Sequence, residues 1–320
     1  MTRKSSKDVA FLIIGGRSVL SAGFTTIGES YERVLEEITG LGDSDDKWGS
    51  VGSRKFEMNQ EGFYDLGANK WHEALEATDP QVLLYAPIGN TLGDRLVAID
   101  GVRTDYNRLP ARGEFHKAKA LYKASSGPES YEQRIAETLS EKAGDGNSTS
   151  NDWGAAVVPY TTGTASFTED SAAVVGTTTV WVASHVGQKI KLDADGVWYK
   201  IASVTDNTHL TLATPFGGST DDGAYTLTNN LGGGVYLAVT AVDLDGGTGL
   251  AITVEHSTND SDWVTLATFT TVTSAPASER KAIALTTTIR RYTRVTRDFT
   301  GTPSGSEAAT FAVGIGRRRA

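Results

Sequence analysis

Apolar and polar residues alternate over many short stretches of this chain. Between Arg54 and Tyr64 the apolar residues Phe56 and Met58 stand two positions apart among polar side chains, and Leu250–Val254 has the same spacing. A period of two places successive side chains on opposite faces of a β-strand. Clusters of turn-forming residues recur about every ten residues, as expected between short strands. The pattern therefore predicts a mainly β chain.

Two other patterns interrupt the alternation in the first part of the chain. Ala10–Ile14, Val82–Tyr85 and Arg95–Ile99 are short apolar runs, and they predict strands. Asn69–Thr78 instead carries its apolar residues on one helical stripe, which ends at Asp79-Pro80. This part of the chain is therefore predicted to hold one helix that lies over a sheet.

Two segments carry apolar residues at helical spacing. In Glu29–Thr39 this spacing, behind a Thr26 or Ser30 cap, favours an amphipathic helix, and the adjacent Glu36 and Glu37 are unusual for a strand. In Glu129–Ala143 it also predicts a helix, because Pro128 precedes the segment and Gly144 follows it. Residues 144–152 are rich in Gly, Asn, Ser and Asp and are expected to form a linker.

The second half of the chain divides into two sets of predicted strands. Lys189–Leu192 and Val197–Ile201 flank Asp195-Gly196, which predicts a hairpin with a type I′ turn. Later alternating runs, beginning at Val235–Val239, predict a β-sandwich. We expect three domains: residues 1–160, a small inserted β module at 161–230, and a C-terminal β-sandwich at 231–320.

One motif carries a family resemblance. Leu41–Trp48 reads Leu-Gly-Asp-Ser-Asp-Asp-Lys-Trp, and the alternating strand after it ends in Gly62-Phe63-Tyr64-Asp65. This arrangement resembles the major tail tube proteins of bacteriophages with long, non-contractile, siphovirus-like tails. A second Leu-Gly-Asp at Leu92–Asp94 is similar to the same pattern. In that family the segment before the first motif is extended, so the resemblance favours a strand over a helix at Glu29–Thr39.

The resemblance implies a fold and a role. The expected fold is a tail-tube domain of β-barrel or sandwich type with one packed helix, followed by the small β module and an immunoglobulin-like C-terminal sandwich on the tube exterior. The expected function is a structural virion protein whose subunits close rings, six to a ring, that stack around a channel for DNA. The expected partners are further copies of the chain, the tape measure protein, the tail terminator and the tail tip proteins, while DNA passes through the lumen without specific binding.

Candidate site residues follow from this role. The loop from Gly42 to Gly52 is too polar to pack inside its own domain, so we expect it to contact the next ring. Its candidate contact residues are Asp43, Asp45, Asp46 and Trp48. On the strand after the loop, the candidate channel-facing residues, whose carboxylates would repel the phosphates of the genome, are Glu57, Asn59 and Glu61.

Charge and composition agree with a structural role. The net charge of the 320 residues is −9, divided as −6, −4 and +1 over the three expected domains, and such a balance disfavours tight nucleic-acid binding. The chain has no cysteine, which fits assembly in a reducing host cytoplasm. Its longest apolar run near the start, Val9–Ile14, is far shorter than a signal segment or membrane span requires.

The sequence gives little support to an enzymatic function. The five histidines are scattered singly, without metal-ligand spacing, and are expected at the surface or on edge strands. Asp193–Gly196 and Asp243–Gly246 resemble fragments of calcium loops but lack the closing glutamate. There is no nucleophile elbow, Walker A motif or dinucleotide fingerprint. We therefore expect no enzyme activity, cofactor or metal.

The sequence also fits other functional hypotheses. A capsid decoration protein or a tail-associated adhesin would use the second and third domains equally well, and would bind glycans through aromatic side chains such as Trp181, Trp198 or Trp263. Basic residues near the C-terminus, Arg294 among them, are candidates for pairing with the acidic second domain.

Overall fold

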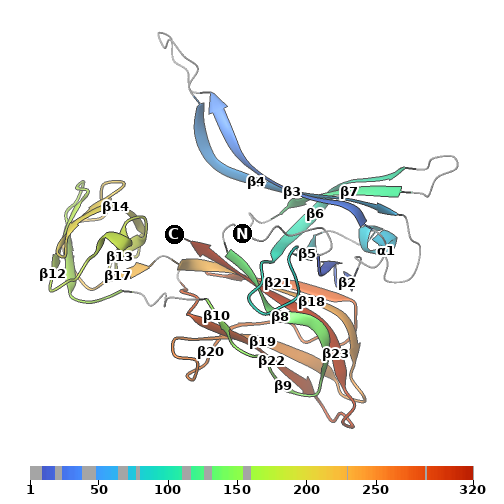
Figure 1. Ribbon diagram of the computed structural model, residues 1–320. Helices are drawn as coiled ribbons and strands as arrows, with labels where there is room; N and C mark the ends of the chain where they lie inside the picture. The colour runs from blue at the N-terminus through green and yellow to red at the C-terminus, as the bar shows by residue number, and fades with distance from the viewer. Residues whose placement is uncertain are drawn as a thin grey trace.

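The fold is mainly β, as the alternation predicts, with one short α-helix among the described elements (Figure 1). We analysed a computed structural model of the chain. It describes residues 9–18, 24–37, 48–63, 71–76, 80–109, 117–125, 132–153, 160–228, 230–284 and 287–319. All strand pairings within its four sheets are antiparallel, and the sheets are named here in the order in which the chain enters them.

The first sheet has the strand order β2-β1-β5-β6-β7-β4-β3. Its strands are β1 (Phe11–Ile14), β2 (Arg17–Ser18), β3 (Phe24–Glu37), β4 (Trp48–Phe63), β5 (Gln81–Ala86), β6 (Val97–Leu109) and β7 (Lys117–Ala124). The helix α1 (Trp71–Glu76) lies within the predicted helical segment. Because β3 extends to Glu37 in register with β4, the expectation of a strand before the loop is confirmed and the helical alternative is wrong.

The concave face of the first sheet holds one hydrophobic core. Ala74 and Leu75 of α1 are fully buried against residues from five strands of this sheet. These strand residues are Leu12, Ile14, Phe56, Met58, Leu83, Tyr85, Val97, Ile99, Ala118, Ala120 and Tyr122. The helix therefore covers the inner side of a bent sheet, as the helical stripe predicted.

The convex face of the same sheet is covered in its β1–β5–β6 part by a second sheet, of order β21-β18-β23-β8. The strands of the second sheet are β8 (Glu132–Ala143), β18 (Asn230–Asp243), β21 (Ala277–Ile283) and β23 (Ala308–Arg319). Leu84 and Ala98 of the first sheet pack against Tyr236 and Ala312 of the second. Burial on both faces explains why the runs at β1 and β5 are apolar without alternation.

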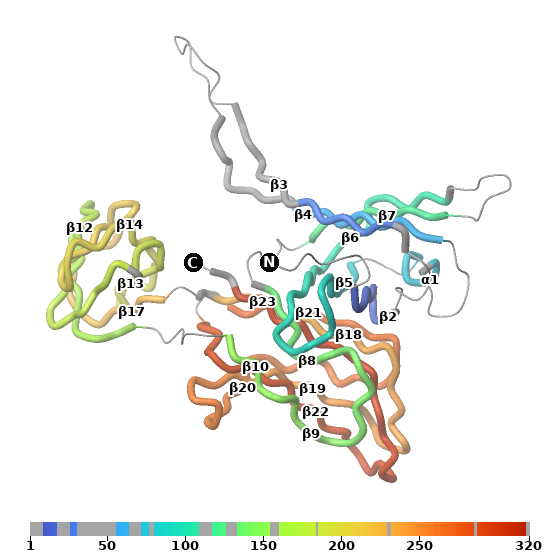
Figure 2. Tube along the Cα trace, in the orientation of Figure 1, coloured from blue at the N-terminus to red at the C-terminus, as the bar shows by residue number. Residues whose placement is uncertain are grey.

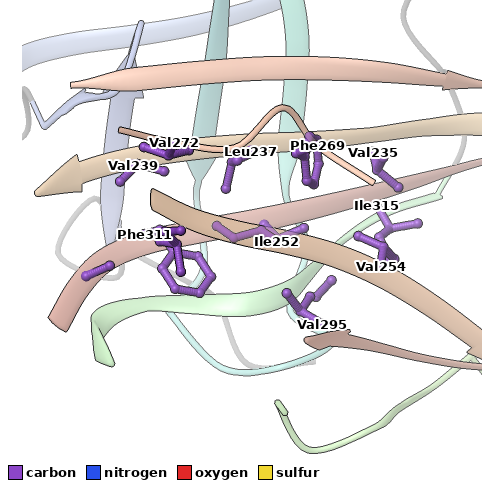
Figure 3. Packing of buried hydrophobic residues seen from close by; sticks show 14 of the residues in the cluster. Val235, Leu237, Val239, Ile252, Val254, Phe269, Val272, Val295, Phe311 and Ile315 are labelled. Atoms are coloured by element: carbon purple, nitrogen blue, oxygen red, sulfur yellow. The ribbon is translucent and has the colours of Figure 1, made fainter. Parts of the chain in front are cut away.

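A third sheet completes a β-sandwich with the second. It has the order β10-β22-β19-β20, with β9 also paired to β22. Its strands are β9 (Gly146–Asn147), β10 (Asn151–Asp152), β19 (Gly249–Ser257), β20 (Val264–Thr268) and β22 (Tyr292–Thr300). Figure 3 shows Leu237 and Phe311 of the second sheet facing Ile252 and Val295 of the third, and all four side chains are buried.

Strand β8 corrects the helix predicted at Glu129–Ala143. Residues 132–143 are extended and pair with β23 from Glu132 to Ala143. The spacing of four between Ile135 and Leu139 fits both a helix turn and two strand periods, so local pattern could not separate them. Backbone groups of the β5–β6 connection also bond to this strand, with Ile135 N–H donating to the Asp94 carbonyl at 3.0 Å. Tertiary pairing therefore overrides helix propensity here.

The pairings of β8, β9 and β10 indicate how the chain divides into structural units. Strands β8, β9 and β10 share the second and third sheets with the strands that follow residue 230. The segment 144–152, expected as a linker, thus includes β9 and β10. We propose three units on this basis: residues 9–125, a sandwich of 132–153 with 230–319, and a module of 160–228 inserted into that sandwich.

The inserted module is a strongly curved sheet of order β16-β11-β12-β15-β14-β13-β17 and forms a separate lobe in the Cα trace of Figure 2. Its elements are β11 (Thr164–Phe167), β12 (Ala173–Thr177), η3 (Ala183–His185), β13 (Lys189–Leu192), β14 (Tyr199–Asp206), β15 (His209–Leu212), β16 (Asp221–Gly223) and β17 (Tyr225–Thr228). The strands β16 and β17 are consecutive in the chain but lie at opposite ends of the strand order, so the sheet approaches a closed barrel. Tyr160 and Leu227 form an antiparallel bridge that brings the two ends of the module together.

The hairpin predicted around Asp195-Gly196 is present, with Ile190 opposite Tyr199. Its turn is longer than the two-residue type I′ turn that the sequence predicted. Gly196 has φ +75°, whereas Asp195 is not among the positive-φ residues, and type I′ requires both. The Gly196 N–H donates to the Leu192 carbonyl at 3.0 Å, within the six-residue connection from Asp193 to Trp198.

Candidate assembly and channel surface

The hairpin formed by β3 and β4 is longer than the rest of its sheet. Strand β4 pairs with β7 only from Glu57 to Phe63, but its pairing with β3 continues to Trp48, opposite Glu37. The outer half of the hairpin is therefore a two-stranded ribbon, and Figure 1 shows it projecting away from the body of the protein. We call this outer half, residues 31–37 and 48–56, the ribbon.

The ribbon leads to the candidate inter-ring loop. Asp43, Asp45 and Asp46 lie outside the residues that the structure describes. Trp48 is the first residue of β4, and its backbone is described while its side chain is not. The contact role of these four residues stays a prediction.

Strand β3 is also the edge of the first sheet. Among the described strands it pairs with β4 alone, over the length from Phe24 to Glu37. An edge strand of 14 residues presents a row of backbone donors and acceptors to a further strand. The other edge is blunt: β2 has two residues, and a Cβ on the neighbouring Gly16 would lie 2.5 Å from the backbone oxygen of Ala277 in the second sheet.

The three candidate channel residues lie on one face of β4. Glu57, Asn59 and Glu61 alternate with Phe56 and Met58, which are buried in the core under α1. The side chains of Glu57, Asn59 and Glu61 point to the outer face of the sheet, away from this core, and all three are partly or fully exposed. We call the outer face of β3, β4, β7 and the second half of β6 the wet face.

Strand β7 places lysines on the same wet face. The register pairs Glu57 with Lys123 and Glu61 with Lys119, and the Glu57 Oε1 to Lys123 Nζ distance is 3.2 Å. The sequence showed the alternation of these lysines but not their partners. Residues in β4 and β7 are about 60 positions apart in the chain, so no local signal indicates which of them face each other.

A small hollow of about 240 Å³ lies at the edge of the wet face, lined in part by Gly28, Glu29 and Asn59. The Asn59 side chain lies across Gly28, where an added Cβ would be 2.0 Å from Asn59 Oδ1. Burial raises the pKa of the Glu29 carboxyl, and Arg95, whose guanidinium is 3.2 Å from it, opposes the shift. Arg95 also forms a backbone bridge with Arg134, so this ion pair connects the hairpin to the sandwich.

His256 corrects the expectation that the histidines lie at the surface or on edges. It is 6% exposed on the central strand β19, and its Nδ1 accepts the Arg290 N–H at 3.2 Å. Burial, with the nearby cations Arg290 and Arg317, lowers the pKa of His256 to about 4. The neutral ring is a structural part of the sandwich.

Protonation of His256 is expected to destabilise the protein in acid. Since its pKa falls from 6.5 in the unfolded chain to about 4 in the folded one, the unfolded state binds the proton more tightly, and stability decreases as pH falls from 6.5 to 4. After allowance for solvent screening we expect a loss of about 2 kcal/mol. His256→Asn keeps an acceptor near Nδ1 without the titration, so its thermal midpoint, followed by circular dichroism, should fall less steeply over this pH range. Equal slopes for the two proteins would contradict the assignment.

The aromatic residues proposed for glycan binding are largely covered. Trp181 is 2% exposed and donates its Nε1–H to Tyr225 Oη at 3.0 Å in the module core, so it cannot stack on a sugar. Lys191 Nζ lies 5.4 Å from the ring centroid of Trp198, and the Arg294 guanidinium carbon lies 4.3 Å from that of Trp263. A cation therefore already lies over the rings of the two partly buried tryptophans.

Three arginines of β22 and its entry have partners within the sandwich of their own chain, whereas the hypothesis paired them with the acidic module of the same or a neighbouring subunit. Arg291 binds both carboxylate oxygens of Asp152, at 2.8 and 2.7 Å. Arg294 Nε donates to Glu255 at 2.7 Å, and Arg297 Nε donates to the Gly144 carbonyl at 2.8 Å.

Within the described residues, no group of three or more acidic, histidine or cysteine side chains is arranged to hold a metal ion. The described part of the chain also contains no helix long and apolar enough to cross a membrane.

Comparison with known proteins gives structural likenesses alone. No protein-family model and no curated protein matches the chain. The tail of an empty gene transfer agent particle, refined with C6 symmetry, is similar at a TM-score of 0.32 and 10% identity, over 39% of this chain and 96% of that chain. The virion of a native gene transfer agent particle is similar at a TM-score of 0.30 and 11% identity, over the same shares of the two chains. The Dit protein of phage SPP1, described as a hub adsorption apparatus in phages that infect Gram-positive bacteria, is similar at 0.27 and 8%, over 96% of this chain and 98% of that chain. TM-scores this low carry no conclusion about the fold or the function of this chain.

Proposed function

We propose that this chain is a structural phage tail protein, and specifically the major tail tube subunit of a siphovirus-like, non-contractile tail. The observation that carries the proposal is the ribbon of β3 and β4, which runs past the rest of its sheet with no third strand beside it in the described structure. A two-stranded ribbon by itself is marginally stable in water. It gains stability where another subunit covers it, as stacked rings would.

Ring closure would use the outer edge of β3, which pairs with no other strand among the described residues. The backbone groups along this edge would bond to a neighbouring copy of the chain, which also removes the aggregation hazard of a long edge. The family resemblance in the sequence sets the expected number at six subunits in a ring. Strand β2 is too short and too closely covered by the second sheet to serve as the matching edge, so the neighbour must offer another segment.

The arrangement of the sheets suggests which side faces the channel. In Figure 1 the strands β3, β4 and β7 lie above, and the sandwich of the second and third sheets lies below. Since α1 covers the concave face, the wet face with Glu57, Asn59 and Glu61 points away from the core. With the wet face toward the lumen, the sandwich and the inserted module would lie on the tube exterior, which suits a tail without a contractile sheath.

The partners follow from this role. A tube of this kind would be assembled in the host cytoplasm around a tape measure protein, begin at tail tip proteins and end at a tail terminator, and its lumen would pass DNA without specific binding. A capsid decoration protein or glycan-binding adhesin is the alternative, but it gives no use to the ribbon, and Trp181, one of the three tryptophans proposed for it, is buried.

Electron microscopy of a loop-shortened variant tests the proposal. Residues 38–47 are replaced with Asn-Gly, which joins Glu37 to Trp48 through a two-residue turn and keeps the observed register. We expect the wild-type protein, concentrated over a series of salt conditions and imaged by negative stain, to form rings that stack into tubes. The shortened variant should form rings without tubes.

A matched control keeps the loop length and changes only charge, as Asp43→Asn, Asp45→Asn and Asp46→Asn. If this control forms tubes and the shortened variant does not, the inter-ring contact depends on the length of the loop. If neither forms tubes, the contact depends on the carboxylates. Full tubes from the shortened variant would contradict the inter-ring role of the loop. Wild-type protein that stays monomeric in every condition would contradict the tube subunit itself.

A further inference from the structure

The wet face is charge-compensated, although the whole chain is acidic. Over the part of this face where β4 pairs with β7, the charged residues are by strand register three carboxylates and three ammonium groups, which gives that part a net charge of zero. These residues are Glu57, Glu61, Asp105, Lys117, Lys119 and Lys123. A wall that repels DNA through excess negative charge, as the sequence suggested, is therefore not what this face presents.

The positive and negative charges of this face also balance pair by pair, because lysines and glutamates are neighbours across the two strands. Lys123 and Glu57 are direct cross-strand neighbours with 51% and 32% of their side chains exposed, and their charged atoms are 3.2 Å apart. Lys119 and Glu61 are direct cross-strand neighbours in the same way, four residues further along the two strands. Directly opposite residues have Cβ atoms about 5 Å apart, within reach of such pairing.

The interaction free energies indicate that the net charge of this face, and not the strength of its ion pairs, determines how it interacts with DNA. An exposed ion pair is worth about 0.2–1 kcal/mol, so phosphate could displace a glutamate from a lysine. Each lysine that neutralises a phosphate releases a condensed counterion and lowers the salt exponent of binding by about 0.9. With a carboxylate beside each of two lysines, the attraction of the lysine and the repulsion of the glutamate largely cancel at a passing phosphate.

The geometry points to Glu57 and Glu61 as groups that mask Lys123 and Lys119 from the phosphates of double-stranded DNA, so that this face neither binds DNA nor repels it. The inference rests on the proposed function for its biological meaning, because the masking matters where this face lines a DNA channel. The masking itself is a property of the single chain. In a ring of six, loss of both carboxylates would add about twelve positive charges to each layer of the wall.

DNA binding by the unassembled protein tests the masking. A fluorescent double-stranded DNA of random sequence is titrated with the wild type and with the Glu57→Gln, Glu61→Gln variant, by fluorescence anisotropy, from 25 to about 200 mM salt. We expect the variant to bind roughly ten-fold more tightly at the lowest salt, with a salt exponent that is more negative by about 1–2.

Two further variants make the result specific. Glu169→Gln with Asp222→Asn changes the net charge by the same two units on exposed residues of the inserted module, and it should bind DNA like the wild type. Adding Lys119→Gln and Lys123→Gln to the double glutamine variant should abolish the gain. Thermal unfolding checks the fold of every variant, and since the pairs are exposed we expect changes within about 1 kcal/mol.

Binding by the double glutamine variant that equals that of the module control would overturn the inference, as would wild-type protein that already binds as tightly as the variant. The result is separable from the proposed function, because the assay needs no ring or tube. Masking that is confirmed in a protein that forms no tubes would refute the tube role alone.

Discussion

Phe311→Ala is expected to lower the free energy of unfolding by about 3–5 kcal/mol. Phe311 is fully buried on β23 between the second and third sheets, among Val239, Leu237 and Ile252 (Figure 3). The loss combines the transfer free energy of the ring with the cost of the cavity that sheets locked by backbone hydrogen bonds cannot close. Denaturant unfolding followed by circular dichroism measures it.

The companion variants separate the cavity from other effects. Phe311→Leu retains most of the apolar volume and should cost about 1–1.5 kcal/mol. Val264→Ala, on the exposed edge strand β20, should change stability by no more than about 0.5 kcal/mol. A loss for Phe311→Ala no larger than that for Val264→Ala would show that the two sheets do not share this core. Because the second sheet also supports the first, we expect Phe311→Ala to reduce ring formation.

Lys142→Met is expected to destabilise the protein by about 3–5 kcal/mol, although it removes only one partner of an ion pair. Glu137 is 4% exposed on β8, and its Oε1 lies 3.2 Å from Lys142 Nζ. Without the lysine, a carboxylate stays buried with two neutral donors from Thr138, its N–H at 3.0 Å and its hydroxyl at 3.5 Å from Oε1. The cost comes from the uncompensated charge and not from the pair itself.

The double variant distinguishes these two sources. Glu137→Gln with Lys142→Met removes both charges and keeps an acceptor for the Thr138 N–H, so we expect stability within about 1 kcal/mol of the wild type. Thermal and denaturant unfolding of the two single variants and the double variant give the coupling free energy. Additive losses would contradict a direct interaction between Glu137 and Lys142.

Local pattern was most successful where a strand has one buried and one wet face. The alternation at β4 correctly separates the buried Phe56 and Met58 from the exposed Asn59. It was least successful at β8, where Ile135 and Leu139 suit both a helix and a strand, and pairing with β23, more than 160 residues later, decides between them.

On the candidate channel surface, too, local pattern predicted one part of the arrangement and strand pairing decided the other. The period of two indicates which residues of β4 share a face, and it also indicates which residues of β7 do so. The pairing of Glu57 with Lys123 depends on the register between the strands, which is set when both bury their apolar sides over one core. A prediction from charge alone thus gave a negative wall, whereas the register places a lysine beside each glutamate.

Composition, alternation and turn residues are local properties, and they suffice for the class of the fold, for most strands and for the single helix over a sheet. Non-local contacts decide the rest. Packing between the first and second sheets explains why Tyr236 and Ala238 are buried on the face opposite Val235 and Leu237. The pairing of β8 with β23, which lies between β8 and β18, places β8 in the second sheet. Such contacts form because each sheet must bury its apolar faces against another layer, and that requirement selects among pairings that the local pattern leaves equivalent.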